Sequence, residues 1–296
     1  MENRMTEQIA TTDSRTEFDA KAAESGQQAT ERYQENHRVE IEVSTERVNL
    51  LAVEVLNSLA DTIRRHKVSY DEFQAVKGWL IQVGLDGEWP LFMDVWVEHV
   101  IEDVATEARH GNKGAIEGPY YVAQAPSLAT PATLPMRADE AGTPLLFQGT
   151  ITTVDGTVLP GATVEIWHAD SHGFYSQYSP GLPEWNLRGT VIADEHGRFQ
   201  INTIEPAPYQ VPTDGACGKL IAAAGWHAWR PAHLHLKVSA PGQQLLTAQL
   251  YFTGDRHLSD DIASAVKPEL ILSPTPVAGG PGEEVTYDFV LDPISA

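Results

Sequence analysis

Residues 232–240 read Ala-His-Leu-His-Leu-Lys-Val-Ser-Ala and carry the clearest structural pattern in the chain. Apolar residues at the even positions alternate with polar residues at the odd positions, which is the period of a β-strand with one face in a core. Short segments of similar composition lie before and after it, separated by turns rich in glycine and proline. This regular spacing predicts an antiparallel β-sandwich or barrel. The segments are residues 151–154, 162–167, 190–193, 198–204, 246–252 and 285–291.

The N-terminal part of the chain has a different pattern. Between residues 44 and 109 apolar residues recur at three- and four-residue spacing, which predicts three amphipathic helices. Ser69 and Glu72 have the spacing of a capping box at the start of the second helix, and Pro90 suits the first turn of the third. Glycines and prolines in residues 110–126 mark a break, after which the strand pattern begins.

The expected fold class is therefore mainly β with α. Residues 1–40 contain few large apolar side chains, so we expect a mobile acidic tail. Residues 41–110 are expected to form a helical segment that packs on something, and residues 111–296 the antiparallel β-sandwich.

Composition narrows the range of partners. The 296 residues carry a formal net charge of −21, which argues against nucleic acid and against an anionic membrane surface. No apolar run approaches the roughly 20 residues of a membrane span. The single cysteine, Cys217, rules out an intrachain disulfide framework and an all-thiolate metal site. We expect a cytoplasmic protein.

His233 and His235 are the sharpest chemical feature. Because side chains alternate along a strand, both imidazoles project from one face and form a ready metal chelate. Two polar residues on the solvent face of a sheet would give the same pattern. The stretch 230–242 has no Asp, Glu or Cys, so it offers neither a carboxylate for an iron(II) facial triad nor a thiolate for zinc.

Two tyrosines stand upstream in loops rich in glycine and proline, Tyr175 in Gly-Phe-Tyr-Ser and Tyr209 in Pro-Ala-Pro-Tyr-Gln-Val-Pro. A phenolate is a hard donor that suits a trivalent ion such as iron(III), and such an ion would depress the tyrosine pKa. Spacing alone does not show that these tyrosines converge on the histidines.

Two more polar residues are candidates for the same site. Arg230 lies three residues before His233 and is placed either to face an anionic substrate oxygen or to form a surface ion pair. Gln249 stands in a strand, as a hydrogen-bond donor to the site or as a solvent-facing residue. His168 is expected to be structural, and Cys217 lacks an activating neighbour.

Around these candidate residues, the sequence resembles that of the intradiol ring-cleavage dioxygenases, and most closely that of the catechol 1,2-dioxygenases. The resemblance runs from about residue 45 to residue 292. It rests on long motifs in one order, at residues 87–94, 117–121, 159–170, 187–189, 208–215 and 229–236.

The resemblance implies a role for each matching position. The metal ligands would be Tyr175, Tyr209, His233 and His235. Arg230, Tyr209 and Gln249 would be catalytic, and Arg230 would also bind substrate. The remaining positions that match the family's substrate cavity are Leu91, Asp94, Gly118, Pro119 and Tyr120.

The resemblance also implies what the site does. The cofactor would be Fe(3+), and the reaction would be opening of the catechol ring by O2 to cis,cis-muconate. The family implies a homodimer joined through the N-terminal helices, with a lipid at that interface. The sequence itself neither supports nor excludes the lipid.

Three alternatives stay open at this point. The same chemistry could act on hydroxyquinol or a chlorocatechol. Residues 158–167 also resemble a hairpin of non-catalytic transthyretin-like and carbohydrate-binding β-sandwich modules. A zinc hydrolase built on His233 and His235 would need a third ligand that the neighbouring sequence does not supply.

Overall fold

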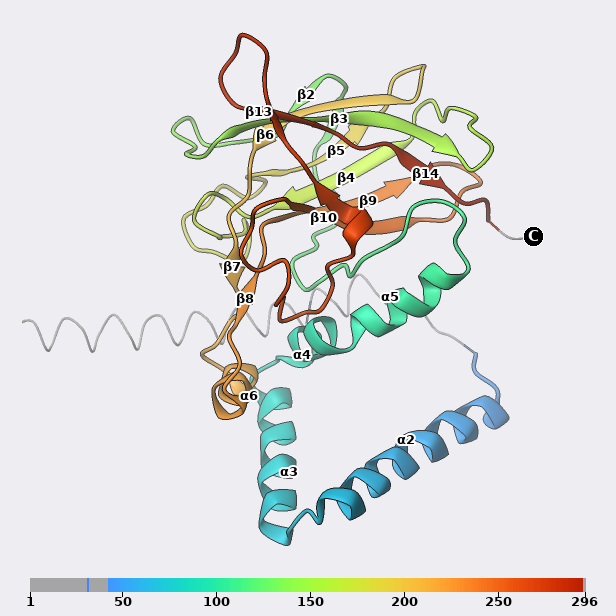
Figure 1. Ribbon diagram of the computed structural model, residues 1–296, viewed down its shortest axis with the longest axis vertical. Helices are drawn as coiled ribbons and strands as arrows, with labels where there is room; N and C mark the ends of the chain where they lie inside the picture. The colour runs from blue at the N-terminus through green and yellow to red at the C-terminus, as the bar shows by residue number, and fades with distance from the viewer. Residues whose placement is uncertain (1–30, 32–41, 295–296) are drawn as a thin grey trace, which may run out of the picture. The chain divides into compact units, whose positions relative to one another are not determined.

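The computed structural model describes residue 31 and residues 42–294 (Figure 1). The chain divides into two compact units, Met1–Trp89 and Pro90–Ala296. The expected tail, residues 1–40, falls almost entirely outside the described residues.

The described part of the first unit consists of two helices, α2 (Thr45–His66) and α3 (Tyr70–Leu85). The Ser44 side chain accepts a hydrogen bond from the Arg47 amide at the start of α2. At the start of α3 the expected capping box is present, because Ser69 and Glu72 exchange side-chain and backbone hydrogen bonds. No residue of α2 is buried.

The expected third helix is two helices, α4 (Trp89–Trp96) and α5 (Glu98–Glu107). Val97, with φ −126° and ψ −39°, lies between them outside helical geometry. None of the described helices is both long and apolar enough to cross a membrane.

One six-stranded sheet carries the histidine strand. Its order is β1-β5-β4-β9-β10-β11. The bounds are β1 Ser127–Ala129, β4 Thr163–His168, β5 Arg188–Ile192, β9 His233–Ser239, β10 Leu246–Phe252 and β11 Ile271–Leu272. Within it, β9 runs antiparallel between β4 and β10, so His235 has Trp167 on one side and Gln249 on the other.

The second sheet has the order β12-β13-β3-β6-β2, and β14 also pairs with β3. The bounds are β2 Ala132–Thr133, β3 Pro144–Thr153, β6 Arg198–Ile204, β12 Thr275–Pro276, β13 Glu283–Thr286 and β14 Phe289–Leu291. Figure 1 shows the two sheets as separate layers, with β3, β6 and β13 in one and β4, β9 and β10 in the other. Buried side chains from both sheets form one hydrophobic core, which includes Phe147, Phe199, Leu236 and Leu250.

The sheets are mixed, which corrects the expectation of a wholly antiparallel fold. The central pairs β3–β6, β4–β5, β4–β9 and β9–β10 are antiparallel. The pairs β1–β5, β10–β11, β13–β3, β14–β3 and β2–β6 are parallel. Only a tight hairpin forces antiparallel pairing, and these short added strands reach their partners through longer connections.

Four smaller elements complete the described part of the second unit. The strands β7 (Tyr209–Gln210) and β8 (Trp229–Arg230) pair antiparallel and place Tyr209 directly opposite Arg230. The helix α6 (Ala216–Ala224) lies between them in sequence, and a 3₁₀ turn (Pro268–Leu270) precedes β11.

Candidate metal centre

Strand β9 contributes to two different interiors. Leu234, Leu236 and Val238 point into the core between the sheets, whereas His233 and His235 point to the opposite face. That face is not open to solvent, because both histidines are at most 1% exposed. A second buried cluster covers them, to which Trp167, Tyr175, Tyr209 and Leu91 belong. The solvent-face interpretation of the histidine pair is therefore wrong.

The two imidazoles face each other through one nitrogen each. His233 Nε2 lies 3.0 Å from His235 Nε2. The other nitrogen of His233 is 2.7 Å from the Pro231 carbonyl oxygen, which requires a proton on Nδ1 and leaves Nε2 unprotonated, where it accepts a 3.4 Å hydrogen bond from Arg230 Nη1. Two metal–nitrogen bonds of about 2.1 Å at a right angle would separate the nitrogens by about 3.0 Å. The pair thus has the spacing of a chelate.

Both loop tyrosines reach this point. Tyr175 Oη lies 3.1 Å from His235 Nε2, and its hydroxyl is hydrogen-bonded to Tyr209. The Tyr209 ring lies 5.6 Å from the His233 ring, centroid to centroid. Two nitrogens and two phenol oxygens, from positions 175, 209, 233 and 235, therefore converge where the sequence could not show that they would.

Gly173 allows the two tyrosine-bearing segments to approach. Its φ is +86°, and a Cβ at this position would stand 2.8 Å from Tyr209 Cβ. Any larger residue would combine a strained backbone with a steric clash. The Gly-Phe-Tyr-Ser loop thus depends on its glycine to carry Tyr175 to the histidines.

Aromatic rings and a glycine fix the orientation of the histidine and tyrosine rings. The Trp167 ring stacks on His235 at 4.8 Å with 10° between the planes. Its indole N–H is buried and has no hydrogen-bond partner among the described residues. The Tyr120 ring stacks on Tyr175 at 4.4 Å. Gly118, with φ +73°, lies against His235, since a Cβ there would be 3.4 Å from His235 Cε1.

Arg230 is held by a buried ion pair. Its Nε and Nη2 donate to the two carboxylate oxygens of Asp261 at 3.0 and 3.1 Å, and both side chains are at most 3% exposed. The Ala263 and Ala265 amides also donate to Asp261. The prediction of an exposed surface pair for Arg230 is thereby wrong. Asp261 was not identified from the sequence, where it is one of many acidic residues in a loop.

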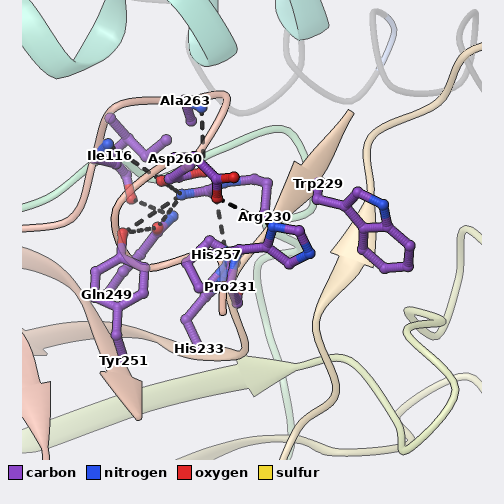
Figure 2. Close-up of polar contacts among 12 residues, drawn as sticks. Ile116, Trp229, Arg230, Pro231, His233, Gln249, Tyr251, His257, Asp260 and Ala263 are labelled. Carbon is purple, nitrogen blue, oxygen red and sulfur yellow. Dashed lines mark hydrogen bonds and ion pairs between the residues drawn. The ribbon is translucent and has the colours of Figure 1, made fainter. Parts of the chain in front are cut away.

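Gln249 continues this network. Its Oε1 accepts from Arg230 Nη2 at 2.8 Å and from the Tyr251 hydroxyl at 2.7 Å. Its Nε2 donates to the Ile116 carbonyl at 3.0 Å (Figure 2). The same Nε2 lies 3.2 Å from His235 Nδ1. The glutamine is fully buried and contacts both the arginine and a histidine, so it is not a solvent-facing residue.

Burial controls the protonation of the four converging side chains. Burial, and then the Arg230 charge, lowers the pKa of His233 to about 3. Burial, and then His233, also lowers the pKa of His235. Burial raises the pKa of Tyr175 and of Tyr209 above the usual phenol value, and the opposing effect of Arg230 does not outweigh it.

This donor set fits a hard cation. Neutral imidazoles keep their lone pairs available, and the buried phenols would ionise only beside a strong positive charge. A trivalent ion supplies that charge, and two phenolates would offset most of it.

The five residues expected to line the cavity differ in how closely they approach this centre. Gly118 and Tyr120 touch it, as described above. Leu91 belongs to the same buried cluster. Pro119 is half-buried between Gly118 and Tyr120 in the chain.

Asp94 lies in an acidic group with Glu98 and Glu117. Burial, and then the charges of Glu98 and Glu117, raises the pKa of Asp94 to about 8. Burial likewise raises the pKa of Glu98 to about 7, although Glu98 accepts hydrogen bonds from the Glu117 and Gly118 amides. Glu117 forms a 2.6 Å ion pair with Lys237 of β9.

His168 has the structural role expected for it. Nδ1 donates to the Ala169 carbonyl at 2.7 Å and Nε2 lies 2.7 Å from the Thr203 hydroxyl, so neither ring nitrogen faces the converging donors. Cys217 is buried in α6.

Comparison with known proteins identifies the family. The family described as "Dioxygenase" matches residues 116–293, and "Catechol dioxygenase N terminus" matches residues 45–113. This chain belongs to the intradiol dioxygenases. The resemblance drawn from the sequence motifs is confirmed.

Similar intradiol dioxygenases include enzymes named for two substrates. The chain is 38% identical to a chlorocatechol 1,2-dioxygenase of Rhodococcus opacus over 252 residues, which is 82% of this chain and 98% of that enzyme. It is 36% identical to a catechol 1,2-dioxygenase of Acinetobacter baylyi, over 79% of this chain and 78% of that enzyme. The crystal structure of 3-chlorocatechol 1,2-dioxygenase from Rhodococcus opacus 1CP matches with a TM-score of 0.81 and 45% identity, over 85% of this chain and all of that one.

As a member of the intradiol dioxygenases, this chain is a ring-cleaving dioxygenase, and its family uses non-haem iron.

Removing the carboxylate partner of Arg230 should destabilise the fold. We predict that Asp261→Asn lowers the free energy of unfolding by about 3–5 kcal/mol, because it leaves a buried guanidinium without its counter-charge. Asp103→Asn is the matched control: Asp103 pairs with Lys267 at 3.1 Å, but its side chain is 60% exposed, so the loss should stay below about 1 kcal/mol. Urea unfolding measures both, and equal losses would contradict the role given to Asp261.

The raised pKa of Asp94 should make stability depend on pH. The folded state holds the Asp94 proton up to a pKa of about 8, whereas the unfolded chain releases it near pH 4. The folded state binds more protons in that window, so this group lowers stability as pH rises from 4 to 8. Asp94→Asn cannot titrate, so we predict that its stability relative to wild type increases between pH 4.5 and pH 8. Thermal unfolding across this range tests it, and a difference independent of pH would contradict it.

Proposed function

We propose that this chain is an iron(III) intradiol dioxygenase that opens catechol rings with O2 to give cis,cis-muconates. The observation that carries the proposal is the convergence of His233 Nε2, His235 Nε2 and the hydroxyls of Tyr175 and Tyr209. A non-catalytic β-sandwich module would have no reason to bury such a group of donors. A zinc hydrolase is disfavoured because the donors that join the histidines are phenols.

These four side chains would hold the iron. Bound there, iron(III) would supply Lewis acidity that draws electron density from a catecholate and opens its ring to attack by O2. Two neutral imidazoles and two phenolates leave a net charge of about +1, which a catecholate dianion replacing one phenolate would bring close to neutrality.

Tyr209 is suited to act as the base. It is hydrogen-bonded to both Tyr175 and Arg230. When substrate replaces Tyr209, its phenolate oxygen would accept one of the two catechol protons, and a hydroxide displaced from the site would accept the other and leave as water. Arg230 stands opposite Tyr209 in the β7–β8 pair, so a proton on Tyr209 Oη would be held beside a group that remains charged.

Arg230 has a second proposed role at the substrate. Burial is the largest influence and would lower its pKa, but the charges of Asp261, Tyr209 and Tyr251 and the Asp261 hydrogen bond together outweigh burial. The net shift of the pKa is upward, so the guanidinium stays cationic. A fixed positive charge next to the site would stabilise negative charge developing on a substrate oxygen. Gln249 and Asp261 would hold it in position.

The substrate is proposed from the names of similar enzymes and from the cavity residues. Leu91, Gly118, Pro119, Tyr120 and Asp94 would form the wall around the ring. Chlorocatechol fits at least as well as catechol, because several similar proteins carry that name and the alignment spans nearly the full length of the Rhodococcus enzyme. Hydroxyquinol remains a third candidate.

The N-terminal helices are proposed to form a homodimer interface. In α2, Val48, Leu51, Val55 and Leu59 recur at three- and four-residue spacing, and each is at least 46% exposed. In α3, Phe73 and Val76 are also exposed. An apolar stripe of this kind on a helical segment is suited to bury itself against a second copy.

The proposed reaction is tested on iron-loaded protein with a substrate panel. We expect a visible tyrosinate-to-iron(III) absorption band, and muconates as products from catechol, 4-chlorocatechol or hydroxyquinol. The ratio of kcat/KM values ranks the three substrates. A protein with no visible band after iron loading would contradict the ligand set. A yellow semialdehyde product would mean extradiol cleavage, and hence a different mechanism.

Tyr209 should be needed for turnover. We predict that Tyr209→Phe lowers kcat/KM by at least about 100-fold, because it removes both a ligand and the base. Tyr178→Phe is the matched control. It lies in the same aromatic cluster, but its hydroxyl is 3.3 Å from the Tyr121 carbonyl rather than among the converging donors. Near-wild-type turnover in Tyr209→Phe would remove this residue from the mechanism.

A further inference from the structure

A second group of metal-ligating side chains lies outside the proposed iron centre. His227, His257 and Asp260 each offer one ligand atom, and these atoms all lie within 4.8 Å of one another. His227 Nε2 is 3.3 Å from one carboxylate oxygen of Asp260, and His257 Nδ1 is 3.1 Å from the other. None of the three belongs to the proposed iron ligands.

We propose that His227, His257 and Asp260 form a separate site for a borderline divalent cation such as Zn²⁺. Two imidazole nitrogens and a carboxylate oxygen are ligands that zinc accepts, and a water at the surface would complete a tetrahedron. Bonds of about 2.0–2.2 Å in tetrahedral geometry separate ligand atoms by about 3.3–3.5 Å. Each His–Asp distance, measured to a different Asp260 oxygen, is close to that separation. The three ligand atoms all lie within 4.8 Å of one another, so a cation would draw them closer by at most about 1.5 Å.

His257 is held in place from several sides. Its ring lies beside the Trp229 ring (Figure 2). The two rings are stacked, with 5.2 Å between centroids and 7° between planes. Its backbone amide donates to Asp255 at 2.8 Å, and the other oxygen of Asp255 accepts from the Ala232 amide at 2.7 Å. The orientation of the His257 ring is therefore fixed before a cation binds, and only the two exposed ligands would need to adjust.

Protons occupy the ligand positions when no cation is bound. The Trp229 amide donates to His227 Nδ1 at 3.1 Å, which places the His227 proton on Nε2, facing Asp260. Arg256 Nε donates to His257 Nε2 at 3.0 Å, which places that proton on Nδ1, also facing Asp260. A cation would take the place of both protons. Each imidazole would then carry its proton on the far nitrogen and lose one hydrogen bond.

This exchange determines what kind of binding to expect. The lost bonds come from exposed Arg256 and from a half-buried strand end, and losing them weakens zinc binding, so we expect micromolar affinity. The protein's net charge of −21 favours the approach of any cation.

The site is connected to the arginine network through the chain. Asp260 precedes Asp261, and His227 is three residues before Arg230. The Ile262 amide donates to the Trp229 carbonyl at 3.2 Å, so the two segments are already in contact. A bound cation would link the two segments next to the Arg230–Asp261 ion pair.

The test uses untagged, iron-loaded, full-length protein titrated with Zn²⁺ at pH 7.5 in competition with a chromophoric chelator. We expect one equivalent of zinc to bind with the iron content unchanged, and the thermal unfolding temperature to rise. His227→Gln and Asp260→Asn should each weaken zinc binding at least about tenfold. Both side chains are 40–50% exposed, so both variants should fold, as unfolding temperatures without zinc will show.

His196→Gln is the matched control, because His196 is an exposed histidine that lies 3.6 Å from Glu195 with no second histidine. It should bind zinc as wild type does. The proposal is overturned if no zinc binds at micromolar concentration, if zinc uptake is matched by loss of iron, or if the two ligand variants bind as tightly as the control. Because the readout is zinc binding, a failure here would leave the proposed iron chemistry untouched.

Discussion

The two-residue period of β9 is the constraint on which the rest of the second unit depends. One row of its side chains, Leu234, Leu236 and Val238, is fixed in the core between the sheets. The other row, His233 and His235, is thereby fixed on the opposite face. A register shift of one residue would place both imidazoles in the apolar core and the leucines among the tyrosines. The apolar core and the candidate metal centre therefore require the same register.

The side chains around the histidine pair each restrict the position or orientation of a neighbouring side chain. Trp167 fixes the plane of the His235 ring from β4, and Gln249 approaches its Nδ1 from β10. Gln249 is itself fixed by Arg230 and Ile116. Arg230 is fixed by Asp261. The whole buried network is polar, and its charges are balanced locally, which keeps the cost of burying them low enough for the fold to hold it.

Much of this could be predicted from the sequence, because the signals were local. The alternation in residues 232–240 predicted the histidine face, and the Ser69–Glu72 spacing predicted a helix start that the structure contains. Pairing direction at the sheet edges could not be predicted, because it depends on where long connections end. The helix break at Val97 carries no local signal such as glycine or proline. Asp261 could not be recognised either, since its partner is 31 residues away in sequence and ordinary acidic loop residues look the same.

The four donor side chains come from distant parts of the sequence, and this affects the metal selectivity of the chain before and after folding. Before folding, only the two histidines are held close together, because a single residue, Leu234, separates them in the chain. Such a pair would favour copper, nickel or zinc over iron in the usual order of affinities. The two tyrosines join only when β7 has paired with β8 and the loop at Gly173 has packed against Tyr209. Discrimination in favour of a trivalent ion would thus be a property of tertiary structure, and incorrect metallation would be a hazard of the nascent chain rather than of the folded enzyme.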